Sequence, residues 1–117
     1  MKVEDILNRD ELFARVDDDL ELLGELIEIF LEDYPDLLAE IEAAVIAKDA
    51  AKLRHAAHTL KGSVGNFCTT GAFEASNKME ISGANEDFST VQGDYQTLLK
   101  EMENVKNALQ LLSQECV

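Results

Sequence analysis

The sequence is poor in several residue types, and each shortage excludes a class of structure. It contains no tryptophan, one proline and two cysteines among 117 residues. Cys68 and Cys116 lie far apart and form neither a disulfide framework nor a metal-binding spacing, so both are expected to be reduced thiols. No apolar run approaches the roughly 20 residues of a membrane span, and the opening MKVEDILNRD lacks the apolar core of a signal peptide. A cytoplasmic protein without membrane insertion is therefore expected.

Basic residues are also scarce, with 10 Lys and Arg against 24 Asp and Glu and a net charge of -14. This balance makes nucleic acid and anionic membranes poor partners. One stretch reverses the sign, because residues 48–61 carry a local charge of +3 and also contain both histidines. Its charged residues are Lys48, Asp49, Lys52, Arg54 and Lys61. The reversal indicates a site for an anion or an acidic partner.

Helix-forming residues are what the sequence has in quantity. Apolar residues make up 46% of the chain, and Leu, Ile, Ala, Glu and Lys dominate its long stretches, which favours helix. No stretch shows convincing strand alternation. The length suits one domain with its own core, taken as residues 1–117.

Four long segments carry core-facing residues at three- and four-residue steps. The first covers residues 19–48, and Pro35 is expected to kink it rather than split it, because the stripe keeps its phase on both sides. Asp49 is a good N-cap for the second segment, and Thr69 or Thr70 can cap the third. The expected core positions are Leu23, Leu26, Ile27, Phe30, Leu37, Leu38, Ile41 and Val45, then Leu53, Ala57, Leu60, Val64 and Phe67, then Phe73, Ser76, Met79 and Gly83, and finally Val91, Tyr95, Leu98, Met102, Val105, Leu109 and Leu112.

Short connections between these segments favour antiparallel neighbours. About one residue is expected near Lys48, two or three near Cys68, and a few over residues 84–87. A short helix over residues 10–16, with Asp10 as its N-cap, precedes the four. The predicted fold is all-α, an antiparallel up-down-up-down four-helix bundle with a short extra N-terminal helix.

The stretch HAAHTLKGSVGN, residues 55–66, places unusual residues on the face opposite this core. At about 100° per residue, His58 points away from the apolar stripe, and Lys61, Gly62 and Gly65 lie within about 60° of it. A helical glycine costs about 1 kcal/mol relative to alanine, so two glycines beside an exposed histidine indicate a landing site for another protein. An imidazole titrates near pH 6.5 and is a competent nucleophile at neutral pH, and the lysine can stabilise an anion.

These residues resemble the signature of histidine-containing phosphotransfer (Hpt) domains, the modules of two-component phosphorelays. The family motif, a run like A-H-x-L-K-G-S, is matched from Ala57 to Ser63, and the likeness extends over roughly residues 10–112. Two features depart mildly from the family pattern. VGNFCTTG follows the glycine-serine pair, where the family often has small residues or leucine. Met79-Glu80 stands where many members have a leucine-glutamate pair. The segment after the motif is expected to tune docking rather than chemistry.

The resemblance implies a function and a set of site residues. His58 would accept a phosphoryl group from a receiver-domain phospho-aspartate and pass it to another receiver, and Lys61 would stabilise the phosphoryl charge. The docking surface would comprise Gly62, Gly65, Ser63, Thr59, His55 and Arg54. The partners implied are response-regulator receivers and a hybrid sensor histidine kinase. The protein would need no metal or cofactor of its own, because the receiver brings Mg²⁺, and a monomer is expected.

Other functions fit the residues less well. A di-iron site needs a glutamate three residues before each histidine, whereas Lys52 and His55 occupy those positions. A hydrolase needs a nucleophile and base together, but Ser63 and His58 lie about 140° apart around the helix. An autokinase needs a glycine-rich nucleotide loop, and the chain has no such loop or ATP-binding domain. A module that docks to a receiver without phosphotransfer is the remaining alternative.

Overall fold

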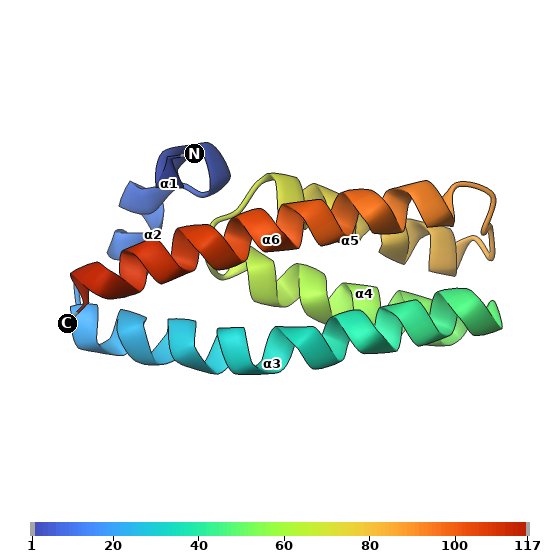
Figure 1. Ribbon diagram of the computed structural model, residues 1–117, viewed down its shortest axis with the longest axis horizontal. Coiled ribbons are helices and arrows are strands. Elements are labelled where there is room, and N and C mark those ends of the chain that lie inside the picture. Colours follow the sequence, from blue (N-terminus) through green and yellow to red (C-terminus); the bar gives the residue numbers. More distant parts are fainter. Residues whose placement is uncertain (1, 117) are drawn as a thin grey trace.

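The computed structural model describes residues 2–116, and within this range the chain is all-helical, with one isolated bridge and no extended strand. Figure 1 shows the long helices lying side by side along the long axis of the molecule, with the short helices beside one end. The molecule measures 42 × 22 × 19 Å. The helices are α1 (Val3–Ile6), α2 (Arg9–Arg15), α3 (Leu20–Ala47), α4 (Ala50–Gly65), α5 (Gly71–Ala84) and α6 (Val91–Glu115). The predicted all-α class is confirmed.

Side-chain caps fix the starts of three helices. Asp19 caps α3 and Asp49 caps α4, each accepting a hydrogen bond from a backbone N–H three residues later. The expected cap at Asp10 is wrong, because Asn8, two residues earlier, accepts a hydrogen bond from the Glu11 N–H and caps α2. Thr70 occupies the N-cap position of α5 without a side-chain hydrogen bond.

The N-terminal segment contacts the C-terminal ends of α4 and α6. Leu7 forms the isolated bridge with Thr69, which follows α4. Arg9 and Glu115 form a bidentate ion pair that ties α2 to the end of α6. Arg15 donates a hydrogen bond to the Gly65 carbonyl oxygen at 3.2 Å. The four-residue helix α1, which the sequence pattern did not predict, belongs to this segment.

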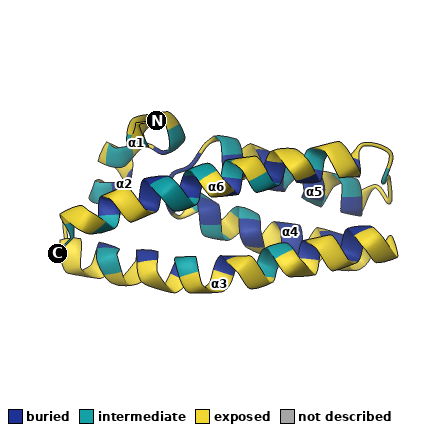
Figure 2. Ribbon diagram, in the orientation of Figure 1, coloured by how far each residue is buried: buried dark blue, intermediate teal, exposed yellow. Residues whose placement is uncertain are grey.

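The core lies between the long helices, and Figure 2 shows buried positions on the faces that these helices turn towards one another. All the core positions predicted for residues 53–67 and 91–112 are buried. Among the other predicted core positions, Leu26 and Phe73 are each 40% exposed, and Leu37 and Leu38 are only partly buried. The helix α3 continues unbroken through Pro35, which excludes a split at that point.

Close packing sets the position of α5 against α4. A Cβ atom on Gly83 would lie 2.6 Å from the Arg54 backbone nitrogen and 2.9 Å from the Ala50 carbonyl oxygen. The end of α5 therefore crosses the start of α4 at a distance that only glycine permits. The connection between them covers residues 66–70, longer than expected, and Cys68 in it has a left-handed backbone with φ of 59°.

The two longest helices meet at the end of the molecule where α3 begins. A Cβ atom on Gly24 would lie 3.2 Å from the Cys116 Cβ atom, so the start of α3 lies beside the residue that follows α6. Among residues 2–116, no helix combines the length and the apolar character that crossing a membrane requires.

Candidate functional site

The outward face of α4 carries the motif histidine. His58 is exposed, with 67% of its side chain accessible to solvent. On the opposite face of the same helix, Leu53, Ala57 and Leu60 are completely buried. The helical spacing that buries the apolar stripe therefore presents the imidazole to solvent, as the sequence predicted.

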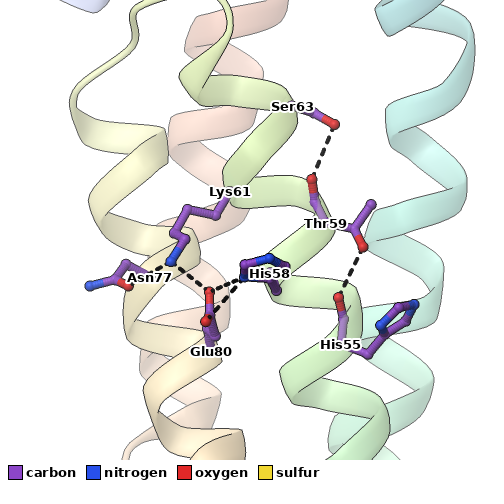
Figure 3. Close-up of polar contacts among 7 residues, drawn as sticks. All are labelled: His55, His58, Thr59, Lys61, Ser63, Asn77 and Glu80. Carbon is purple, nitrogen blue, oxygen red and sulfur yellow. Dashed lines mark hydrogen bonds and ion pairs between the residues drawn. The ribbon is translucent and has the colours of Figure 1, made fainter.

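Glu80 of α5 holds the imidazole from the neighbouring helix. Its two carboxylate oxygens each lie 3.2 Å from Nδ1 of His58 (Figure 3). The Glu80 side chain is only 19% exposed, so it is more shielded than the histidine that it contacts. The contact fixes which ring nitrogen faces the protein and which one faces solvent.

Lys61 completes a three-residue cluster with the same carboxylate. Its Nζ lies 2.8 Å from Oε1 of Glu80 and donates a 3.4 Å hydrogen bond to Oδ1 of Asn77 (Figure 3). It also lies 6.0 Å from the centroid of the Phe73 ring. The hydrogen bond from Lys61 lowers the pKa of Glu80, and the contact with His58 adds to this effect against the opposing effect of burial. Glu80 is therefore ionised at neutral pH.

The ionised carboxylate determines the tautomer of a neutral imidazole. A carboxylate can only accept hydrogen bonds, so Nδ1 of His58 must carry the proton that bonds to Glu80. The lone pair of the neutral ring then resides on Nε2, on the side away from the carboxylate. The site thus presents an exposed nitrogen nucleophile with a lysine ammonium nearby.

The two motif glycines differ in their surroundings. A Cβ atom on Gly62 would meet nothing within 4 Å, so this position opens directly to solvent. A Cβ atom on Gly65 would contact the Phe73 ring at 3.4 Å, an ordinary van der Waals distance. The cleared surface beside His58 is therefore centred on Gly62, and Phe73 bounds it at Gly65.

The other residues expected around the site lie in two groups. Arg54, His55, His58 and Glu80 line one shallow depression together with Ala51. Thr59 and Ser63 lie apart from the Glu80 cluster in Figure 3, and their hydroxyls bond back to the carbonyl oxygens of His55 and Thr59, each at 3.1 Å. Only the first group shares a surface with the Glu80 contact.

Ser63 belongs instead to an apolar groove between α2, α3 and α4. The groove has a volume of about 360 Å³ and is lined mainly by apolar side chains. Leu26 and Ile29 border it and are 40% and 56% exposed, with Arg15 and Asp33 among its charged residues. Leu26, which was predicted to lie in the core, is therefore part of a continuous apolar surface that adjoins α4.

Glu80 is the site residue that the sequence reasoning did not assign. The sequence shows it only as half of the Met79-Glu80 pair, because the spacing within one helix does not show which residue of another helix it will meet. The pair itself was the available signal, since Met79 is buried and Glu80 follows it at the edge of the same helix. Among residues 2–116, no three His, Cys, Asp or Glu side chains gather in an arrangement that could hold a metal ion.

Comparisons with known proteins identify the family of the chain. The model of the Hpt domain family matches residues 25–114, and the chain belongs to this family. Hpt domains carry phosphoryl groups between receiver domains in phosphorelays, so this chain is a phosphorelay intermediate with receiver domains as partners.

The fold is similar to that of a solved relative. The crystal structure of histidine-containing phosphotransfer protein B (HptB) from Pseudomonas aeruginosa PAO1 matches with a TM-score of 0.87 and 22% sequence identity, covering 93% of this chain and 95% of that one. No curated protein sequence gives a significant match.

Proposed function

We propose that His58 carries the phosphoryl group of the relay on its Nε2 atom. The Nε2 lone pair attacks the phosphorus of a receiver phospho-aspartate, the bond from phosphorus to the aspartate oxygen breaks, and the aspartate leaves as a carboxylate with the bonding electrons. Transfer to a second receiver reverses these steps. The observation that carries the assignment is the contact of Glu80 with Nδ1, which directs the nucleophilic nitrogen outward.

Lys61 is proposed to stabilise the phosphoryl charge. Its ammonium is one helical turn from His58 and is already held at the site by Glu80 and Asn77. A short movement of this flexible side chain would bring it to a phosphoryl oxygen, where a charge-assisted hydrogen bond is stronger than a neutral one. The receiver brings the Mg²⁺, and this chain supplies no metal or cofactor.

The receiver is proposed to dock over Gly62. Since nothing lies within 4 Å of a Cβ atom there, a partner backbone or side chain can approach His58 closely. Arg54 and His55 border the depression beside His58 and suit an acidic partner. Gly65 lies on the same face of α4 as His58, whereas Thr59 and Ser63 lie around the helix from it, and Ser63 borders the apolar groove. These three residues are proposed to form the rim of the docking surface.

The helix topology, the oligomeric state and the phosphoryl donor are proposed by analogy with the family. The four long helices are proposed to form the antiparallel up-down-up-down bundle, supported by the crossing of Gly83 with Ala50 and of Gly24 with Cys116. Residues 1–117 are proposed to act as one monomeric cytoplasmic domain that receives its phosphoryl group from a hybrid sensor histidine kinase.

The test is phosphoryl transfer from a phosphorylated receiver with Mg²⁺, followed by intact mass. The wild type and His55→Gln are expected to gain an acid-labile phosphoryl group, whereas His58→Gln gains none and keeps its circular dichroism. Acceptance by His58→Gln would overturn the assignment. Binding of several receivers without any adduct in the wild type would instead indicate the docking-only module.

A further inference from the structure

We infer that Glu80 keeps the Nδ1 proton on the phosphorylated ring of His58 and so prepares the phosphoryl group to leave. This inference rests on the proposed carrier role of His58. It assigns Glu80 as a positioning residue, because it acts on the reacting nitrogen through the imidazole ring rather than by touching the phosphoryl group.

The geometry favours a protonated phospho-imidazole. Phosphorylation at Nε2 uses the outward nitrogen, so Nδ1 still faces the carboxylate oxygens that lie 3.2 Å from it. With its Nδ1 proton in place, the phosphorylated ring is positively charged. An opposite charge at this distance favours the charged form, and the partly buried position of Glu80 limits screening by solvent.

The Nδ1 proton decides how readily the phosphoryl group departs. When the bond from phosphorus to Nε2 breaks, the bonding electrons stay on Nε2. A ring that has kept its Nδ1 proton leaves as a neutral imidazole. A ring that has lost the proton must leave as an imidazolate anion, which is a much poorer leaving group. Holding the proton therefore raises the rate of transfer to any acceptor.

The charges around the ring single out Glu80. From α4, Arg54 and His55 share the depression with His58, and Lys61 contacts the carboxylate. These cationic or titratable groups oppose a positive charge on the ring. From α5, Glu80 contributes the carboxylate in direct contact with Nδ1, and Asn77 beside it is neutral. Lys61 keeps this carboxylate ionised, so the pair works as a unit.

The test loads the phosphoryl group chemically, with phosphoramidate, so that it does not depend on finding a receiver. The rate of phosphoryl loss from His58 is then followed by mass across pH 5 to 9 for the wild type and Glu80→Gln. Loss should be fast at low pH, where Nδ1 is protonated, and should slow as pH rises. Without the carboxylate, the midpoint of this fall is expected about 0.5–1 pH unit lower, which makes the loss about three- to tenfold slower at pH values above both midpoints.

Glu74→Gln is the matched control, because it removes the same charge from an exposed position on the same helix. Its pH profile should coincide with that of the wild type. Nitrogen NMR of the unphosphorylated ring gives a second readout, in which Glu80→Gln should lose the preference for the Nδ1–H tautomer. Coincident pH profiles and an unchanged tautomer in Glu80→Gln would overturn the inference while leaving the carrier role of His58 intact, since the adduct would still form there.

Discussion

At the scale of single residues, the site is built from one cluster that spans two helices. His58 and Lys61 come from α4, and both meet the carboxylate of Glu80 from α5. Each member limits the freedom of the others: Glu80 fixes the ring nitrogen that faces outward, and Lys61 keeps Glu80 ionised. A motif of one helix is thus completed by a residue 22 positions later in the chain.

Gly62 is expected to trade stability for partner access. Because nothing lies near its missing Cβ atom, Gly62→Gln should fit the free protein and raise the free energy of unfolding by about 0.5–1 kcal/mol through better helix propensity. The same side chain should obstruct the receiver and weaken binding by about tenfold, the factor that 1.4 kcal/mol represents. Urea unfolding and titration with a cognate receiver measure the two effects.

Gly93→Gln provides the comparison, because Gly93 lies in α6 and is equally open. It should leave receiver affinity unchanged. An unaltered affinity in Gly62→Gln as well would contradict the proposed landing site.

Much of the residue-level site was predictable, for reasons of helical geometry. The exposure of His58 and its nearness to Lys61 and Gly62 follow from positions on one helix, where sequence spacing fixes direction. The role of Glu80 and the contact of Gly65 with Phe73 depend on how α5 lies against α4, which no local spacing shows. The misplaced cap at Asp10 is a local error, because Asn8 offered an earlier side-chain acceptor.

At the scale of elements, the distance between α4 and α5 controls the site. Gly83 lies three residues after Glu80 and touches the α4 backbone near Arg54 and Ala50. The long core stripes of α4 and α6 were predictable from their periodicity, whereas the outward positions of Leu26 and Phe73 were not, because apolar spacing alone does not show which surface another element covers.

Gly83→Ala is expected to separate the two helices. A methyl group 2.6 Å from a backbone nitrogen cannot be relieved by rotating a side chain, so the expected loss of unfolding free energy is about 1–3 kcal/mol. Urea unfolding measures it, with Gly93→Ala as the same chemical change in open space. Equal stability of the two variants would show that the α4–α5 contact is not tight.

At the scale of the whole molecule, positive charge is concentrated in the stretch that contains His58, and the rest of the chain is strongly acidic. The net charge of -14 contrasts with the cations of residues 48–61. The all-α class and the phosphotransfer family were predictable because periodicity, length and motif agree. The packing of the N-terminal segment through Arg9 and Glu115 was not, because it joins residues 106 positions apart.

Added salt is expected to affect folding and partner binding in opposite directions. Screening reduces repulsion among the many acidic side chains, so the melting temperature should rise between low salt and 0.5 M NaCl. It also weakens attraction between the basic stretch and an acidic receiver, so the association rate should fall over the same range. Calorimetry and stopped-flow binding measure these changes, and a melting temperature that falls with salt would contradict the first.

The backbone distributes its glycines in an unusual way that has a practical consequence. All six glycines lie in helices, whereas each connection from α2 to α6 contains a residue other than glycine with positive φ: Asp17 and Asp18, Lys48, Cys68 and Glu86. A left-handed backbone costs such residues about 1–2 kcal/mol each. The backbone strain therefore lies in the connections between the helices, away from the face of α4 that carries His58. Substitution of these residues by glycine should therefore raise the stability of the protein without altering the proposed docking surface.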